Sequence, residues 1–130
     1  MVCLESDFLI EFIRKKPEAV SKMVELEKTG QLLSITPVTA AELFEGAFLS
    51  KETGSILSLE ELLATFQMLD FDLFAAKKAG QLMAGLSKEG QKIGDLDTLT
   101  AAIALRHDQA LATRNKKHFS KVPGLKIVEW

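Results

Sequence analysis

The amino-acid sequence predicts an α/β fold, in which a parallel β-sheet of four to five strands is sandwiched between helices (α/β/α). Short apolar runs of strand length alternate with longer runs whose apolar residues follow helical spacing, which is the pattern of βα units. Three acid-bearing stretches, at residues 4–7, 39–42 and 94–97, each lead directly into a helix-like run. Because the carboxyl ends of parallel strands lie along one edge of an open sheet, we expect these acids to meet there.

Length and composition indicate a single domain spanning residues 1–130. With 47% apolar and 26% charged residues, the chain has a globular composition. The formal net charge of −2 excludes a general basic field for nucleic acid, so any such contact must be local or mediated by metal.

The sequence gives three indications of cellular location. The single cysteine, Cys3, excludes an internal disulfide and lies in an apolar run, which favours a buried position in a reducing compartment. No run approaches the ~18 apolar residues of a membrane span, and no basic leader precedes the first apolar run. We therefore expect a cytoplasmic protein with no membrane partner.

The first half of the chain is predicted to hold two strands and four helices. Ser6 is suited to cap the first helix, which ends near the Lys15-Lys16-Pro17 break. Gly30 is expected to end the second helix, and Gly54-Ser55 separates the last two. The remaining expected elements are strands at 1–4 and 31–35 and helices at 18–28, 37–49 and 57–64.

The second half continues the alternation of strands and helices. Asp72 is expected to open a helix that reaches residue 86, and a polar, Gly-punctuated loop follows at 88–94. The other expected elements are a strand at 66–71, a helix at 97–107 and strands at 110–113 and 125–128. Strands alternating with helices of this length predict a parallel sheet with helices on both faces.

Glu42 has two explanations. In Thr39-Ala40-Ala41-Glu42, Thr39 can cap a helix while Glu42 reaches back to the cap amide, which is a capping box. Alternatively, Glu42 is a metal ligand, since a carboxylate in a first helical turn points toward the sheet edge. Carboxylates gathered on one edge repel each other unless cations hold them together. The pattern therefore favours a divalent-metal site, with phosphodiester hydrolysis as the first chemistry to consider.

Two pairs of acids mark the other junctions. Asp95 is suited to cap its helix or to act as a peripheral ligand, and Asp97 is expected to point into the site. Glu5 follows a fully apolar strand that we expect to be central, so it is either a site acid or a solvated charge at a strand end. Asp7, two residues further on, suits a capping role in the first turn.

Polar and basic residues follow the fourth predicted strand. Asn115 can hydrogen-bond a carboxylate or serve as a turn residue. His107 and His118 have no Cys or His partner at zinc spacing, so we expect neither to be catalytic. A basic stretch beside an acidic metal site could position phosphates, and its RNA-binding candidates are Arg114, Lys116 and Lys117.

Four motifs together resemble the PIN-domain ribonucleases, specifically the VapC-type toxins of toxin–antitoxin pairs. Each motif alone is weak, but their order and spacing cover nearly the whole chain. They are MVCLESDFLI at 1–10, PVTAAEL at 37–43, GDLDTLTAA at 94–102 and LATRNKKHF at 111–119.

The resemblance implies a PIN-like fold, Mg²⁺- or Mn²⁺-dependent cleavage of RNA, a small antitoxin that blocks the site, and a homodimer. Metal ions would orient and deprotonate a water for in-line attack. Asp7 is an accessory candidate beside the first acid. Carried onto this sequence, the catalytic and metal-binding acids are Glu5, Glu42 and Asp97, the accessory acid is Asp95, and the polar helpers are Thr39 and Asn115.

Two positions depart from the family pattern. The first acid of the family is typically Asp, whereas this chain has the longer Glu5, and a misplacement of about 1 Å can cost ~100-fold in rate. Asn115 and His118 stand where some members carry an additional acid. One alternative is therefore a catalytically impaired PIN-fold module that binds RNA or an antitoxin. Another, from a different class, is a two-component receiver domain with Asp70 after its third strand.

Overall fold

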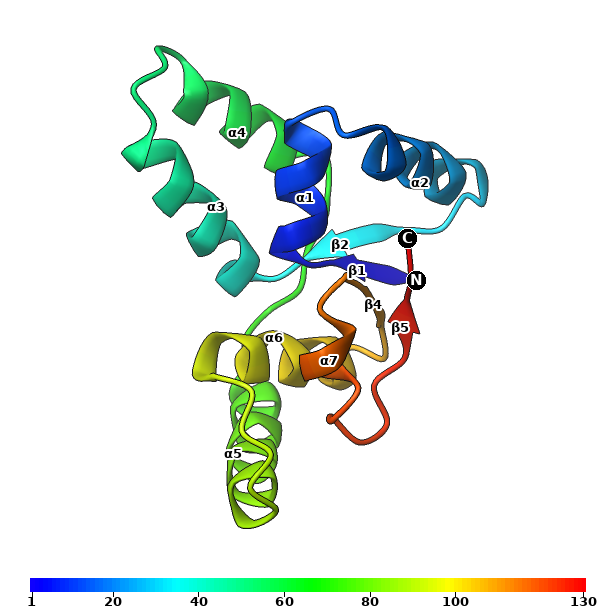
Figure 1. The fold of residues 1–130 in the computed structure, drawn as a ribbon, viewed down its shortest axis with the longest axis vertical. Helices are drawn as coiled ribbons and strands as arrows, with labels where there is room; N and C mark the ends of the chain where they lie inside the picture. Colours follow the sequence, from blue (N-terminus) through cyan, green and yellow to red (C-terminus); the bar gives the residue numbers. More distant parts are fainter.

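The structure is a computed structural model that describes residues 1–130. Five parallel strands form one sheet in the order β3-β2-β1-β4-β5, and seven helices surround it (Figure 1). The elements are β1 (Val2–Leu4), α1 (Ser6–Ile13), α2 (Pro17–Lys28), β2 (Leu33–Ile35), α3 (Pro37–Leu49), α4 (Ser55–Leu63), β3 (Gln67–Met68), α5 (Leu73–Lys88), α6 (Asp95–Arg106), β4 (Ala110–Ala112), α7 (Lys116–Phe119) and β5 (Ile127–Val128). The predicted α/β/α fold with a parallel sheet is confirmed.

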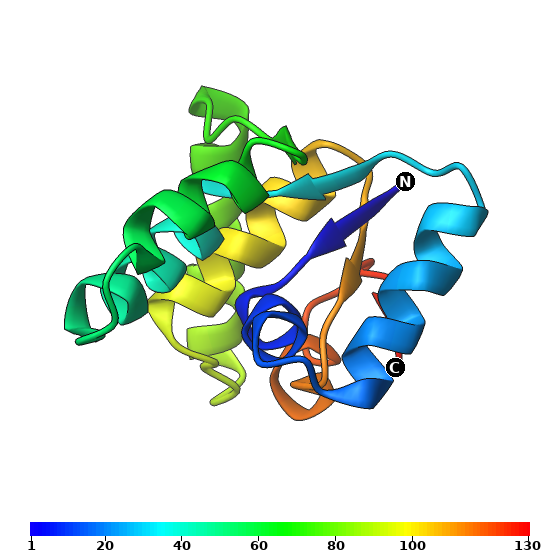
Figure 2. The same cartoon turned by 90° about the horizontal axis from the view of Figure 1, so that it is seen from above.

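Strand β1 is the centre of the sheet, as its fully apolar sequence predicted. It pairs with β2 on one side and with β4 on the other (Figure 2). Alternate side chains of a strand point to opposite faces, so Val2 and Leu4 enter one hydrophobic core and Cys3 enters the other. Cys3 is fully buried, and this burial raises the pKa of its thiol to about 12.

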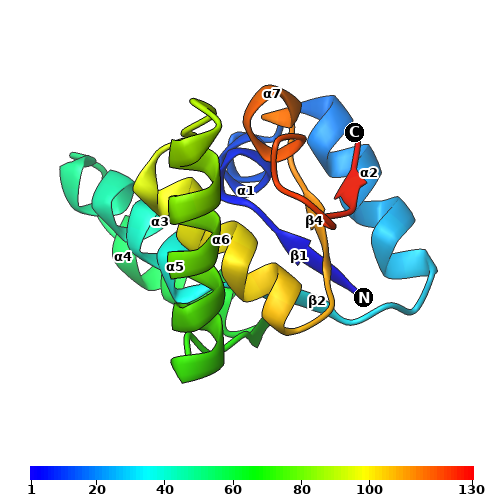
Figure 3. The ribbon, with the colours of Figure 1, turned by 90° about the horizontal axis from the view of Figure 1, so that it is seen from below.

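The helices divide between the two faces of the sheet. Helices α1 to α4 lie on one side, and α5, α6 and α7 lie on the other (Figure 1). On the second side, α5 packs across α6, as Figure 3 shows from below. With the helices divided in this way, the carboxyl edge of the sheet is left to the loops and first helical turns that follow the strands. No helix is both long and apolar enough to cross a membrane.

The start of α3 differs from the predicted capping box. Thr36, not Thr39, is the N-cap: its Oγ1 accepts a hydrogen bond from the N–H of Thr39 at 3.0 Å. Pro37 occupies the first helical position, where its missing N–H costs nothing. Glu42 therefore lies beyond the first turn and cannot reach back to a cap amide. The capping explanation of Glu42 is wrong, because the Thr-Pro start was overlooked.

Two other helix starts also differ. Gly94 caps α6 with φ +96 and ψ 151, a conformation suited to glycine, so Asp95 is the first helical residue rather than the cap. Glu5, not Ser6, caps α1. Asp72 caps α5 as predicted, with Oδ1 accepting from the N–H of Ala75 at 2.8 Å.

Candidate active site

Glu5 lies where the strand order reverses, between the carboxyl ends of β1 and β4. Its N–H donates to the carbonyl of Ala112 at 3.1 Å, which places it beside Thr113. The carboxylate turns back over the start of α1. Oε2 accepts from the N–H of Asp7 at 3.2 Å and from the Thr113 hydroxyl at 3.4 Å, and Ser6 donates to Oε1 at 2.7 Å. Glu5 is only 4% exposed, so it is not a solvated charge at a strand end.

Asp7 has donors on both carboxylate oxygens. Oδ1 accepts from the N–H of Phe8 at 2.6 Å. Oδ2 accepts from the N–H of Arg114 at 2.8 Å and from the Thr113 hydroxyl at 3.1 Å. The Thr113 side chain thus bridges Asp7 and Glu5, and Asp7 ties the first turn of α1 to the segment that follows β4.

The two acids at the end of β1 do not behave as independent charges. Burial raises the pKa of Glu5 to about 8, and the neighbouring Asp7 carboxylate adds to the rise, while the Ser6 hydroxyl opposes it. In the metal-free protein, Glu5 therefore carries a proton near neutral pH.

Glu42 reaches the same edge from α3. Burial raises the pKa of Glu42, and the Ser6 hydroxyl opposes part of this rise. The negative charges of Asp97, Glu45 and Asp7 raise the pKa further. Oε1 of Glu42 is buried and accepts no hydrogen bond. A buried carboxylate oxygen with no donor is costly, and a cation is one partner that would satisfy it. The hydroxyl of Thr39, one turn earlier in α3, is also buried without a partner.

Asp97 approaches from the first turn of α6. Its Oδ2 lies 3.1 Å from Nδ1 of His118 and 3.4 Å from Nδ2 of Asn115. Asp95, two positions earlier, is exposed and makes no side-chain hydrogen bond. The two acids therefore point in different directions, as their spacing requires.

His118 was not expected to be catalytic, but the short helix α7 brings it into contact with Asp97. Asn115 precedes α7 and His118 lies in it, so the two side chains, three residues apart, share one face. Nδ2 of Asn115 and Nδ1 of His118 are 3.0 Å apart. The spacing Asn-x-x-His after a strand that ends near an acid was the available signal. We overlooked it because the expected partners were zinc ligands.

The basic candidates are placed unequally. The Arg114 guanidinium pairs with Glu11 at 3.7 Å and with Glu18, and it lies over the ring of Trp130. The side chain of Lys116 pairs with that of Glu129. Lys117 is exposed and forms no ion pair. Of the three, only Lys117 has a cationic head that no carboxylate engages.

The predicted metal ligands lie on one edge but do not close into a cage. No three acidic, His or Cys side chains are close enough to surround one ion. The donor set is nevertheless of the right kind. Carboxylate oxygens suit Mg²⁺ and Mn²⁺, the pKa of both Glu5 and Glu42 is raised, and Oε1 of Glu42 has no partner. The chemistry of these donors therefore fits a divalent ion, although Glu5, Glu42 and Asp97 do not surround a single point in this structure.

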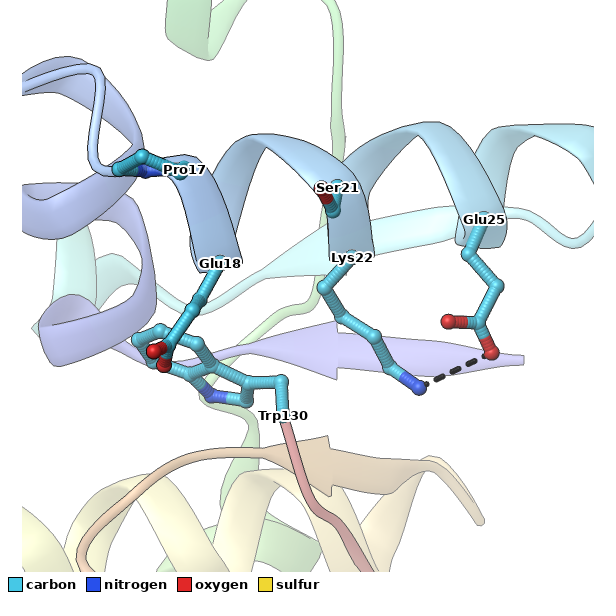
Figure 4. A pocket seen from close by; sticks show the side chains of 6 residues that line it. All are labelled: Pro17, Glu18, Ser21, Lys22, Glu25 and Trp130. Atoms are coloured by element: carbon cyan, nitrogen blue, oxygen red, sulfur yellow. Dashed lines mark hydrogen bonds and ion pairs between the residues drawn. The ribbon is translucent and has the colours of Figure 1, made fainter.

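Two cavities of the structure lie away from these acids. One, of about 390 Å³, is open to solvent and lies between Trp130 and the residues of α2 that Figure 4 labels. The other, of about 460 Å³, lies at the opposite edge of the sheet, near Met1, Gln109 and Lys126. Neither is lined by Glu5, Glu42 or Asp97.

Comparison with known proteins gives a consistent result. The family model for the PIN domain matches residues 2–125. The tRNA(fMet)-specific endonuclease VapC of Salmonella typhimurium is 29% identical over 128 residues, covering 98% of this chain and 96% of the relative. Ribonuclease VapC10 of Mycobacterium tuberculosis is 33% identical, covering 97% and 91%. The crystal structure of VapBC2 from Rickettsia felis, bound to a DNA fragment from its promoter, contains a chain with TM-score 0.89 and 27% identity, covering 100% and 99%.

The chain belongs to the PIN-domain family. Within this family its relatives are VapC ribonucleases and its structural neighbours are VapBC assemblies, so the resemblance seen in the four sequence motifs is confirmed. The receiver-domain alternative is wrong. Strand β3 is a two-residue edge strand separated from β1 by β2, and Asp70 after it is exposed and remote from the acids of β1.

Proposed function

We propose that this protein is the toxin of a VapBC-type toxin–antitoxin pair, a divalent-metal-dependent endoribonuclease that hydrolyses RNA phosphodiester bonds. One observation carries the assignment to a site: Oε1 of Glu42 is buried without a hydrogen-bond donor, near the acids Asp7 of α1 and Asp97 of α6, whose charges add to the raised pKa of Glu42. The relatives named as ribonucleases, matched over nearly their whole length, support the same activity.

Mg²⁺ or Mn²⁺ is the proposed cofactor, held by Glu5, Glu42 and Asp97. When bound, such an ion supplies a nucleophilic water at neutral pH and stabilises the charge that develops on the phosphate. It also cancels the carboxylate field that would otherwise repel the RNA backbone.

The surrounding residues orient these acids. Asn115 and His118 hold Asp97 from one side, and Thr113 and Asp7 hold Glu5 from the other. Such supporting contacts fix the direction of a ligand and preserve its position between turnovers. Lys117 is the remaining candidate for a phosphate contact, since its ammonium group is exposed and unpaired. We assign Thr39 an accessory role and Asp95 a peripheral position on which metal binding and cleavage do not depend, since it is exposed and makes no side-chain hydrogen bond.

The partners follow from the relatives. The solved neighbours include VapBC complexes from Rickettsia felis and Salmonella typhimurium, which supports a small antitoxin protein as the partner of this chain. We also propose a homodimer and a cytoplasmic location, where the RNA substrate is found. Light scattering on the purified chain, alone and with its antitoxin, tests both assemblies.

The decisive experiment compares two variants that remove the same charge from the same helical turn. Calorimetric titration of Mn²⁺ is made into wild-type protein, Asp97→Asn and the control Asp95→Asn. We expect Asp97→Asn to abolish measurable binding and Asp95→Asn to bind within about 2-fold of wild type, because Asp95 is exposed and engages nothing.

RNA cleavage is then measured with Mn²⁺ on the same three proteins. The initiator tRNA named for the Salmonella relative is the first probe, followed by total RNA. Wild type and Asp95→Asn should cleave and Asp97→Asn should not. Equal binding and equal cleavage in all three proteins would refute the acidic edge as the active site. Metal binding without any cleavage would favour the alternative of a module that binds RNA or an antitoxin.

A further inference from the structure

Trp130 contacts two residues that are far apart in the sequence but adjacent at the acidic edge. Its ring meets the ring of Phe8 edge-on, with centroids 4.9 Å apart and an interplanar angle of 89°. The guanidinium of Arg114 lies over the same indole, with Cζ 4.0 Å from the ring centroid. Both geometries are favourable for aromatic and cation–π contacts.

These two residues are the ones whose backbone amides hold Asp7. The N–H of Phe8 donates to Oδ1 of Asp7 at 2.6 Å, and the N–H of Arg114 donates to Oδ2 at 2.8 Å. Each oxygen of the Asp7 carboxylate is therefore held by a segment that packs on Trp130. Through the hydroxyl of Thr113, which contacts both Asp7 and Glu5, the arrangement extends to the first predicted catalytic acid.

The Arg114 guanidinium is itself kept over the ring by carboxylates. Glu11 from α1 and Glu18 from the first turn of α2 both pair with it. In Figure 4 the carboxylate of Glu18 extends from α2 to the edge of the Trp130 ring. Nε1 of Trp130 is buried without a hydrogen-bond partner. The indole therefore acts through its ring alone, so Phe at this position would lose ring area but no hydrogen bond.

We propose that Trp130 is a positioning residue for the acid pair at the end of β1. Its ring clamps the Phe8 and Arg114 segments together, and their two amides fix the Asp7 carboxylate, which in turn fixes Glu5 through Thr113. The Trp130 clamp has two expected effects. Its effect on the rate of RNA cleavage rests on the proposed ribonuclease function, whereas its effect on the position of the Asp7 carboxylate does not.

The test compares Trp130→Leu with Trp130→Phe, using a matched control. Phe74, which lies under Arg106 at 4.7 Å and is 67% exposed, forms the other cation–π pair of the chain, so Phe74→Leu removes the same kind of contact away from the site. The first readout is the pair of amide resonances of Phe8 and Arg114 in proton–nitrogen correlation spectra. The second readout is the steady-state kinetics of RNA cleavage with Mn²⁺, in which kcat and KM are determined separately.

We expect Trp130→Leu to move both amide resonances toward unbonded values and to lower kcat on the order of 10-fold, with KM changed less than about 2-fold. Trp130→Phe should retain both resonances and most of kcat, and Phe74→Leu should change neither. Unmoved resonances in Trp130→Leu, or moved resonances with wild-type kcat, would overturn the clamp.

A second variant covers the case in which Trp130→Leu does not fold. The double substitution Glu11→Gln and Glu18→Gln lies on half-buried and exposed positions and frees the guanidinium from its carboxylates. It should move the Arg114 amide resonance and the emission of Trp130, the single tryptophan, while the Phe8 resonance stays. No movement of the Arg114 resonance would overturn the clamp. Wild-type protein that shows the expected resonances but cleaves no RNA would refute the ribonuclease function and leave the clamp standing.

Discussion

Nδ1 of His118 lies 3.1 Å from Oδ2 of Asp97, although 21 positions separate the two residues in the chain. In the tautomer with its proton on Nδ1, His118 donates to the carboxylate that we propose as a metal ligand. Nδ2 of Asn115 donates to the same oxygen of Asp97 at 3.4 Å. Helix α7 therefore supplies polar support to Asp97.

His118→Ala is expected to weaken Mn²⁺ binding on the order of 10-fold without unfolding the protein, because loss of an orienting partner typically costs 10–100-fold in metal affinity. Calorimetry measures the affinity and circular dichroism checks the fold. His107→Ala is the matched control. Its imidazole contacts the carbonyl of Asp70 at 2.9 Å, far from the acids, and its loss should leave Mn²⁺ affinity unchanged. Equal Mn²⁺ affinities of the His118→Ala and His107→Ala variants would show that His118 does not support the metal site.

The raised pKa of Glu5 predicts how the stability of the metal-free protein depends on pH. Glu5 has a pKa of about 8 in the folded protein against 4.5 in the unfolded chain. The folded state therefore binds more protons between these values. The stabilisation is complete below pH 4.5 and is lost as the pH rises through 8. We expect the free energy of unfolding in EDTA to fall by on the order of 4 kcal/mol between pH 5 and pH 9.

Two controls isolate Glu5 in this experiment. Glu5→Gln keeps the shape but cannot ionise, so its urea-unfolding free energy should depend less on pH, with a residual slope from Glu42, whose pKa is also raised. Saturating Mg²⁺ should reduce the slope of wild type, because metal binding favours the ionised ligands. A wild-type slope identical to that of Glu5→Gln would show that Glu5 titrates normally.

Glu5→Asp tests whether the longer acid impairs this chain. In the structure the extra methylene lets the carboxylate fold back to cap α1 and accept from the Asp7 amide. Since Asp is itself a good N-cap, we expect Glu5→Asp to cleave RNA within about 10-fold of wild type and Glu5→Gln to lose about 100-fold or more. A gain above 10-fold in Glu5→Asp would indicate an impaired wild-type site and support the binding-module alternative.

The central features of the fold could be predicted because they follow from local chemistry. The apolar run of β1 with an acid after it indicated a central strand, and Gly30 after α2 adopts the positive φ of a helix end, at 71°. The edge strand β3 was expected over 66–71 but contains two exposed residues. An apolar run alone does not show whether a strand is paired on both sides.

The polar contacts of the site could not be predicted in the same way. The Asp7 carboxylate receives N–H groups from Phe8 and from Arg114, 107 positions away, and no spacing rule connects such segments. Helix α7 contains four residues, too few for a periodic pattern, so His118 seemed isolated. Sequence reasoning found the acids because the strand ends determine their positions, and it found Asn115, which donates to Asp97. It missed the support from Thr113 and His118, because tertiary packing determines where those side chains lie.

Thr36 and Thr39 provide a final test, because both are fully buried and only Thr36 has a partner. Its hydroxyl oxygen accepts the N–H of Thr39, whereas the Thr39 hydroxyl bonds to nothing. Thr36→Val should lower the free energy of unfolding by about 1–2 kcal/mol through the lost cap. Thr39→Val should leave it unchanged or raise it by up to about 1 kcal/mol, because an unsatisfied hydroxyl is removed.

Urea unfolding of both variants measures these differences, and RNA cleavage with Mn²⁺ adds a second comparison. If Thr39→Val destabilised the protein more than Thr36→Val, Thr39 rather than Thr36 would be the N-cap of α3, in contradiction to the structure. Suppose instead that Thr39→Val is as stable as wild type but loses activity. The unpartnered hydroxyl then belongs to the reaction, since it lies one turn before Glu42, and its partner is present only when metal and RNA are bound.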